Sequence, residues 1–147
     1  MPLAPHLRLA PPTACVPDPL DPRVGKILRE LFPELHHVAC RQAHAAIRLA
    51  VASGAPESYA LRIAPDGIAI SAPDAAGFFY ALQTLRQIRA QSGAALPCCE
   101  IEDAPALPRR GYYLDVSRGR VPRLEMLQRR IRLLAALKIN HLQLYFE

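Results

Sequence analysis

Hydrophobic and polar positions alternate most regularly between residues 59 and 70. Tyr59, Leu61 and Ile63 are separated by smaller or charged residues, and residues 68–70 continue the alternation after a Pro-Asp-Gly sequence at 65–67. Alternation with a period of two is typical of strands that bury one face, and a short turn between two such runs joins them as a hairpin. This segment therefore predicts a β-hairpin.

Apolar residues recur with the helical period on either side of this hairpin. Pro22 suits the first turn of a helix that runs to about Phe32 and is ended by Pro33. Asp74 opens a second helix, which Gly93 is placed to end. The predicted apolar faces consist of Val24, Ile27, Leu28 and Leu31 in the first helix and of Phe78, Ala81, Leu82, Leu85 and Ile88 in the second.

These elements predict one α+β domain over residues 21–104, behind an extended, proline-rich arm at residues 1–20. Further strands are expected at residues 6–10, 45–52 and 98–101. The expected architecture is a small, mostly antiparallel sheet with two helices on one face. No group of residues in this domain has a catalytic pattern. The sequence Ala-Pro-Ala-Leu-Pro at 104–108 is a stiff connector, and we place the domain boundary there.

The segment at 105–147 predicts a strand, a helix and a second strand. The helix begins after Pro122 and carries an apolar stripe of Leu124, Leu127, Ile131 and Leu134. Tyr113 and Asp115 lie on one side of the first strand. One side of the second strand carries a polar row of His141, Gln143, Tyr145 and Glu147, and the other side carries Leu142, Leu144 and Phe146.

Two parallel strands joined by a helix are how a (β/α)8 TIM barrel begins, and such barrels do their chemistry at the carboxyl ends of their strands. Asp115 and Arg118 lie where the first strand should end, and Glu147 lies at the end of the second. Bulky aliphatic residues usually fill a barrel interior. A polar row facing inward therefore indicates a pocket for a molecule with hydroxyl groups.

The composition excludes several classes of protein. The 147 residues are 51% hydrophobic, which is enough for one domain with a core. The net charge is +5, but the arginines are scattered, and their densest cluster at 129–132 falls on the polar face of a predicted helix. We therefore expect no nucleic-acid partner. No stretch has the length of a membrane span or of a signal peptide's apolar region, so we expect a cytoplasmic protein without a membrane partner.

The cysteines and histidines do not form a metal-binding pattern. The chain has four cysteines, Cys15, Cys40, Cys98 and Cys99. None is part of a Cys-x-x-Cys pair or has a histidine at a zinc-finger spacing. His36, His37 and His44 are close in sequence, but no carboxylate completes a ligand set. We expect buried free thiols, no metal site and no cofactor.

Several spaced motifs resemble glycoside hydrolase family 20, the β-N-acetylhexosaminidases. Leu-Asp-Val-Ser-Arg at 114–118, preceded by Arg110-Gly111 and followed by Pro122, is similar to the opening of that family's catalytic barrel. The sequence LKINHLQLY at 137–145 is similar to its second barrel strand. Residues 72–85 and 96–110 are similar to the α+β domain that precedes the barrel. The motifs cover residues 57–147, and the first 56 residues match by position only.

The resemblance implies a hydrolase that removes terminal β-linked N-acetylglucosamine or N-acetylgalactosamine from a glycan. In that family the acetamido oxygen of the substrate is the nucleophile, and the anomeric configuration is retained. An adjacent Asp-Glu pair near the fourth barrel strand orients the acetamido group and protonates the leaving oxygen. That region would lie beyond residue 147, so we expect no catalytic residue in this chain.

Two residues are candidates for substrate binding. Arg118 matches the family arginine that binds hydroxyls of the non-reducing sugar, and a guanidinium has five fixed donors suited to adjacent oxygens. The alternative is a salt bridge from Arg118 to Asp115, three positions earlier, which we interpret as a structural residue. Glu147 lies at the carboxyl end of the second strand, at the mouth of the expected barrel, where it either reaches the ligand or has no part in binding.

A TIM barrel takes roughly 250 residues, many more than follow the connector. We therefore expect this chain to be a fragment of such an enzyme and to be inactive by itself. The uncovered apolar surface of residues 110–147 predicts self-association, aggregation or disorder. The alternative is a non-catalytic module that binds carbohydrate or protein. The sequence leaves open the linkage, the gluco or galacto preference and the oligomeric state.

Overall fold

The computed structural model describes residues 6–7, 13–16, 21–33, 36–39, 46–93, 95–119 and 121–147. The chain divides into two compact units, Met1–Pro105 and Ala106–Glu147. In the part of the chain that the structure describes, no helix has both the length and the apolar character needed to cross a membrane.

The first unit contains a six-stranded sheet in the order β3-β2-β4-β6-β5-β8. Its strands are β2 (Thr13–Val16), β3 (His36–Ala39), β4 (Ile47–Val51), β5 (Tyr59–Ala64), β6 (Gly67–Ala72) and β8 (Cys99–Asp103). The short strands β1 (His6–Leu7) and β7 (Leu96–Pro97) form a separate antiparallel pair.

The large sheet is mixed, so the prediction of a mostly antiparallel sheet was wrong. β2 pairs in parallel with β3 and β4, and β4 pairs in parallel with β6. Only β5 pairs antiparallel, with β6 and β8. The strand that follows β4 in sequence, β5, does not lie beside it. The next strand, β6, lies between β4 and β5 and pairs with both. Alternation shows which face a strand buries, but it carries no information about which strand lies beside it.

The predicted hairpin is confirmed as β5 and β6. Ala64 pairs with Gly67 across the two-residue Pro65-Asp66 turn. Gly67 has φ +135°, and a Cβ there would lie 2.6 Å from the carbonyl oxygen of Ala46. The N–H of Ile68 donates to the same oxygen at 2.8 Å. A residue without a side chain is therefore required where the turn passes the start of β4.

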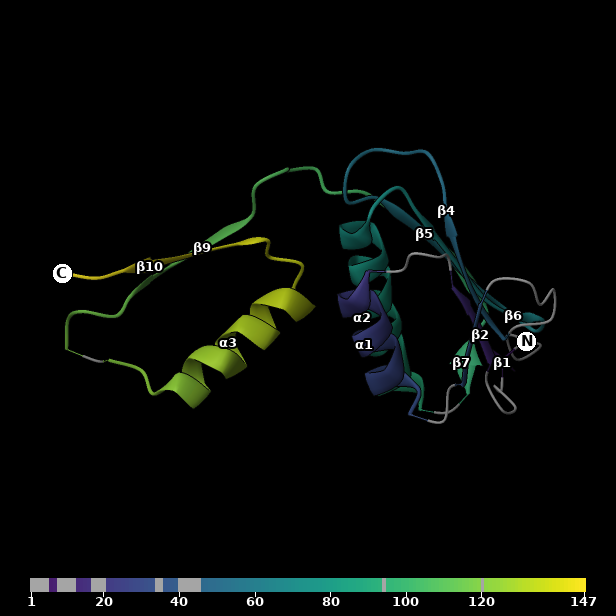
Figure 1. Ribbon diagram of the computed structural model, residues 1–147, viewed down its shortest axis with the longest axis horizontal. Helices are drawn as coiled ribbons and strands as arrows, with labels where there is room; N and C mark the ends of the chain where they lie inside the picture. Colours follow the sequence, from purple (N-terminus) through teal and green to yellow (C-terminus); the bar gives the residue numbers. More distant parts are fainter. Residues whose placement is uncertain are drawn as a thin grey trace, which may run out of the picture. The chain divides into compact units, whose positions relative to one another are not determined.

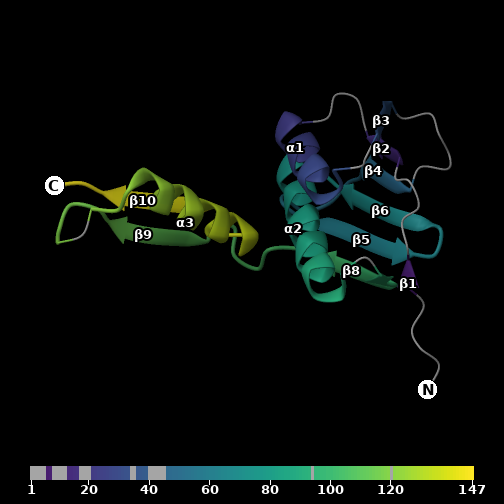
Figure 2. The same cartoon turned by 90° about the horizontal axis from the view of Figure 1, so that it is seen from below.

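Both predicted helices are confirmed, and they lie side by side on one face of the sheet (Figures 1 and 2). α1 (Pro22–Leu31) is capped by Asp21, whose Oδ1 accepts from the Arg23 N–H at 2.8 Å. α2 (Ala75–Ser92) is capped by Asp74, whose Oδ1 accepts from the Gly77 N–H at 2.7 Å. These caps supply acceptors for first-turn N–H groups, which have no partner inside a helix.

The hydrophobic core of the first unit lies between the two helices and the sheet. The most deeply buried large side chains are Val24, Leu28, Phe32, Ile47, Leu61, Ile63, Ile68, Ile70, Leu82 and Leu85. Each such side chain contributes about 1.5–3 kcal/mol when it leaves water. Arg89 of α2 donates to the Leu31 carbonyl oxygen, and its guanidinium lies 4.7 Å from the centre of the Phe32 ring. The end of α1 is thereby held against α2.

The second unit consists of β9 (Gly111–Asp115), α3 (Leu124–Ala136) and β10 (His141–Tyr145). The two strands pair in parallel, and α3 lies along one face of the pair (Figure 1). Of the stripe predicted to face a core, Leu134 is buried, but Leu124 is 70% exposed and Ile131 is 51% exposed. Two strands are too narrow to cover the whole apolar surface of the helix, and its buried residue, Leu134, lies in its last turn.

A polar network fixes the start of both strands in the second unit. Asn140 accepts from the Arg110 N–H at 2.9 Å and donates its amide N–H to the Pro108 carbonyl at 2.8 Å. The Arg110 Nε–H donates to the carbonyl oxygen of Lys138, also at 2.8 Å. Because these bonds join the residues before β9 to those before β10, they set the parallel register from its first pair.

Candidate functional site

The carboxyl ends of β9 and β10 bring the predicted site residues together. Asp115 is the register partner of Tyr145, and the Val116 N–H donates to the Tyr145 carbonyl oxygen at 3.1 Å. Arg118 follows β9 by three residues, and Glu147 follows β10 by two. The parallel register therefore places Arg118 and Glu147 at the same end of the strand pair.

Asp115 organises the turn that follows β9. Its Oδ1 accepts three hydrogen bonds, from the Ser117 N–H at 2.9 Å, the Ser117 hydroxyl at 2.8 Å and the Arg118 N–H at 3.3 Å. The hydrogen bond from the Ser117 N–H is the main cause that lowers the pKa of Asp115 below its ordinary value, followed by that from the Ser117 hydroxyl. Asp115 is thus a carboxylate at neutral pH, and the turn depends on it.

Arg118 is held by two carboxylates and one aromatic ring. Its Nε lies 3.4 Å from Asp115 Oδ2 and 3.4 Å from Glu147 Oε2. Its guanidinium carbon lies 5.4 Å from the centre of the Tyr145 ring, within the range of a cation–π interaction. The side chain is still 65% exposed, so the guanidinium remains accessible to a ligand.

The sequence alternatives for Arg118 are therefore compatible. The salt bridge to Asp115 is present, and it engages the Nε side of the guanidinium. No described residue accepts a hydrogen bond from the two Nη atoms of Arg118. A planar guanidinium with its terminal donors open can bind two neighbouring oxygens of a ligand.

The two faces of the strand pair differ as the alternation predicted. On one face, the Tyr113 and Tyr145 rings lie 6.1 Å apart between their centres. On the other face, the Tyr112 hydroxyl accepts from the Nη1–H of Arg130 in α3 at 3.2 Å. The row that contains Tyr145 therefore lies on the face of the strand pair that is turned away from α3.

Sequence reasoning placed Tyr145 in the polar row but did not recognise its contact with Arg118. The available signal was its position two residues before Glu147, on the same face of the strand. The pairing of Tyr145 with Asp115 also depends on the register, which the sequence pattern does not determine.

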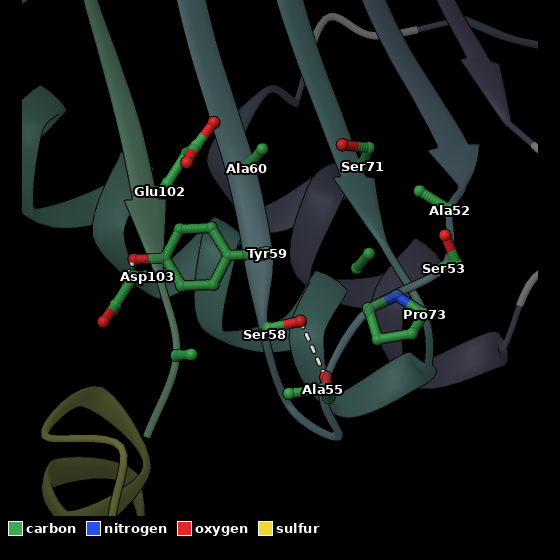
Figure 3. Close-up of a pocket in the computed structure, with 12 residues that line it drawn as sticks. Ala52, Ser53, Ala55, Ser58, Tyr59, Ala60, Ser71, Pro73, Glu102 and Asp103 are labelled. Atoms are coloured by element: carbon green, nitrogen blue, oxygen red, sulfur yellow. Dashed lines mark hydrogen bonds between the residues drawn. The ribbon is translucent and has the colours of Figure 1, made fainter. Parts of the chain in front are cut away.

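A separate hollow of about 440 Å³ lies in the first unit, at one end of the sheet (Figure 3). It is lined by Ala52, Ser53, Ala55, Ser58, Tyr59, Ala60, Ser71, Ala72, Pro73, Glu102, Asp103 and Ala104. The Tyr59 hydroxyl donates to Asp103 Oδ2 at 2.9 Å and shares a 2.7 Å hydrogen bond with the Thr84 hydroxyl. Ser58 donates to the carbonyl oxygen of Ala55 at 2.6 Å. These bonds hold neighbouring segments together, which is a structural role.

The described residues contain no group of three or more His, Cys, Asp or Glu side chains arranged to hold a metal ion. Cys98 and Cys99 are free thiols and half-buried, and burial is the main cause that raises the pKa of Cys99. Cys98 lies between β7 and β8 rather than in a strand. Cys40, His44 and the side chains of Cys15, His36 and His37 lie outside the described residues.

Comparison with known proteins identifies a family for the first unit. The family described as glycosyl hydrolase family 20, domain 2, matches residues 8–104. The chain is 33% identical over 92 residues to a beta-hexosaminidase of Akkermansia muciniphila, covering 60% of this chain and 18% of that protein. It is 37% identical over 89 residues to the N,N'-diacetylchitobiase of Vibrio harveyi, covering 60% of this chain and 10% of that protein.

Solved structures extend the similarity to almost the whole chain. The β-N-acetylhexosaminidase of Bacteroides fragilis superposes with a TM-score of 0.84 at 25% identity, over 97% of this chain and 30% of that one. A mutant Streptomyces plicatus β-hexosaminidase in complex with the product GlcNAc superposes with a TM-score of 0.80 at 32% identity. The match covers 98% of this chain and 32% of the Streptomyces chain.

The fold and the comparisons define a protein whose α+β domain matches the N-terminal domain of hexosaminidases. The chain belongs to glycoside hydrolase family 20, the family of the β-N-acetylhexosaminidases. It spans less than a third of the length of the Akkermansia, Vibrio, Bacteroides and Streptomyces proteins that it matches.

Proposed function

We propose that this chain supplies the α+β domain and the first βαβ unit of a β-N-acetylhexosaminidase, and that Arg118 binds hydroxyls of the terminal sugar. The observation that carries the proposal is the arrangement of Arg118. Its guanidinium lies at the carboxyl ends of two parallel strands, with its terminal donors open and two carboxylates behind it. Catalytic and binding residues of (β/α)8 barrels lie at this end of the strands.

The pairing of β9 and β10 supports the proposal of a barrel, because two parallel strands alone leave backbone groups without partners. In the described chain, β9 and β10 pair only with each other, so each strand keeps one unpaired edge. A two-stranded sheet is marginal in water, and parallel strands normally belong to larger sheets covered by helices. Further βα units on both edges would complete the hydrogen bonding.

The surface of α3 supports the same conclusion. Leu134, in the last turn of α3, is buried, whereas apolar residues on both sides of it around the helix remain exposed. One flank carries Met126 (51% exposed) and Leu133 (58%), and the other carries Leu124 (70%) and Ile131 (51%). In a (β/α)8 barrel each helix has a neighbouring helix on either side, which would cover both flanks.

The proposed reaction is the substrate-assisted, retaining hydrolysis of terminal β-linked N-acetylglucosamine or N-acetylgalactosamine. The acetamido oxygen of the substrate attacks the anomeric carbon as the glycosidic oxygen leaves, and water later completes the hydrolysis. Arg118 would donate hydrogen bonds to hydroxyls of the sugar and so fix the ring for this attack. The acid and the acetamido-orienting group would come from residues outside these 147, so the chain alone is proposed to be inactive.

The test is to express the complete reading frame that contains this chain and to assay it on p-nitrophenyl N-acetyl-β-glucosaminide. We expect hydrolysis by that product, none by the 147-residue chain, and a fall of about 100-fold in kcat/KM for Arg118→Ala. A 100-fold fall is about 2.7 kcal/mol, which is close to the lower bound of about 3 kcal/mol for two hydrogen bonds from a charged donor.

Arg129→Ala is the matched control, because Arg129 is an exposed arginine of α3. Its kcat/KM should equal that of the wild type. An inactive wild-type product, or an Arg118→Ala enzyme with full activity, would contradict the proposal and favour a non-catalytic binding module.

A further inference from the structure

We infer that Asp115, Glu147 and Tyr145 are positioning residues that hold the Arg118 guanidinium in its ligand-binding orientation. The inference rests on the proposed sugar-binding role of Arg118. It assigns the role of Glu147 differently from the sequence prediction, because Glu147 acts through Arg118 rather than as a separate ligand contact.

The two carboxylates approach the same side of the guanidinium. Asp115 Oδ2 and Glu147 Oε2 each lie 3.4 Å from Nε, which carries a single N–H. The edge formed by the two Nη atoms is therefore left for another acceptor. Because the guanidinium is planar and rigid, fixing one side also fixes the direction of the opposite edge.

Asp115 is itself a rigid support. Its Oδ1 accepts from both polar groups of Ser117 and from the Arg118 N–H, at distances from 2.8 to 3.3 Å. Three donors on one oxygen prevent rotation of the carboxylate and direct Oδ2 toward the arginine. One side chain thus fixes both the backbone of Arg118 and its guanidinium.

Tyr145 supplies the third contact. Its ring lies 5.4 Å from the guanidinium carbon, and the ring is tilted by 33° relative to Tyr113 at a centroid distance of 6.1 Å. An aromatic face below the guanidinium restricts its movement perpendicular to the ring. The three supports come from two strand ends that meet only because of the parallel register.

Such support matters because Arg118 is a long, exposed side chain. A free arginine loses rotamer freedom when it binds a ligand, and this loss lowers affinity. Two charges and a ring that already hold the side chain reduce that loss. The contacts around Arg118 therefore favour ligand binding, although its ion pairs are exposed and add little to folding stability.

The experiment compares variants of the enzyme from the complete reading frame on p-nitrophenyl N-acetyl-β-glucosaminide and on its 3-, 4- and 6-deoxy analogues. Each analogue lacks one hydroxyl, so the ratio of kcat/KM between parent and analogue measures how well that hydroxyl is bound. We expect a large ratio in the wild type for at least one analogue and a ratio near one for Arg118→Ala.

Glu147→Gln should lower kcat/KM on the parent substrate by about 3-fold, and Asp115→Asn by about 10-fold. Both should also reduce the ratio for the same hydroxyl that Arg118 binds. Asparagine keeps the oxygen that accepts the turn hydrogen bonds, and Glu147 is exposed, so neither variant should fail to fold. Glu125→Gln, an exposed acid of α3, is the control and should leave every ratio unchanged.

The outcomes separate the two proposals. If Arg118→Ala loses the discrimination but Glu147→Gln and Asp115→Asn keep the wild-type ratios, Arg118 binds sugar without these supports and the positioning inference is wrong. A uniform loss on all substrates with unchanged ratios would also overturn it. If Arg118→Ala behaves as the wild type, the sugar-binding role fails, and the positioning role fails with it.

Discussion

Gly77 shows how one residue without a side chain permits a close approach between two segments. It lies in the first turn of α2, where its N–H donates to the capping carboxylate of Asp74. A Cβ at this position would lie 2.2 Å from the carbonyl oxygen of Ser58 and 2.9 Å from the Cβ of Ala72. The second oxygen of Asp74 also accepts from the Glu57 N–H at 2.9 Å. The helix start is thus tied directly to the segment before β5.

Gly77→Ala should lower the free energy of unfolding by about 3 kcal/mol, because backbone atoms must move to admit the methyl group. Alanine is intrinsically better than glycine in a helix by about 1 kcal/mol, so the expected loss is net of that gain. Urea unfolding of the chain, followed by far-UV circular dichroism, measures the effect. Gln91→Ala in the exposed last turn of the same helix is the control and should stay within about 0.5 kcal/mol.

At the scale of the element, α1 depends on a charged cap. Asp21 accepts from the backbone N–H of Arg23 at 2.8 Å and forms an ion pair with its guanidinium at 2.7 Å. The side-chain hydrogen bond to Arg23 is the main cause that lowers the pKa of Asp21 from 3.8 to about 2. The folded state therefore favours the ionised carboxylate more than the unfolded state does.

The contribution of the Asp21 charge should be fully present above pH 4 and should be lost as the pH falls toward about 2. Asp21→Asn keeps a capping oxygen but removes the titrating group. We therefore expect the difference in unfolding free energy between wild type and variant to be constant from pH 5 to 8 and to shrink between pH 4 and 2. A difference that stays constant through that acid range would show that the charge of Asp21 does not stabilise α1.

At the scale of the whole molecule, the hydrophobic core is distributed unequally between the two units. The buried cluster of apolar residues belongs to Met1–Pro105. In the described part of Ala106–Glu147, the buried apolar residues are Val116 and Leu134. The second unit therefore has little apolar burial to offset the conformational entropy of its chain.

Hydrogen exchange of the 147-residue chain should reveal this difference. We expect amides of β5, β6 and α2 to exchange at least about 100-fold more slowly than those of β9 and β10. Leu82→Ala, at a fully buried position of α2, should speed exchange in the first unit and leave β9 and β10 unchanged. Equal protection in β9 and β5 would mean that the second unit is stabilised by more than its own residues.

The sequence by itself determined the local elements. The hairpin at 59–72 followed from alternation and a Pro-Asp-Gly turn, and α1 and α2 followed from apolar periodicity with Asp and Gly at their ends. These signals are local, because a cap or a turn acts through neighbouring backbone groups. Family membership was likewise readable from short motifs, and the comparisons confirm it.

Only the tertiary structure decided how these elements combine. The mixed strand order, with β6 placed between β4 and β5, and the contact of Tyr145 with Arg118 both depend on which strands pair and in what register. The exposed flanks of α3 also reflect the number of strands beside it rather than its own pattern. Strand pairing and side-chain burial are set by contacts between residues distant in sequence. The periodicity within one segment does not reveal those contacts.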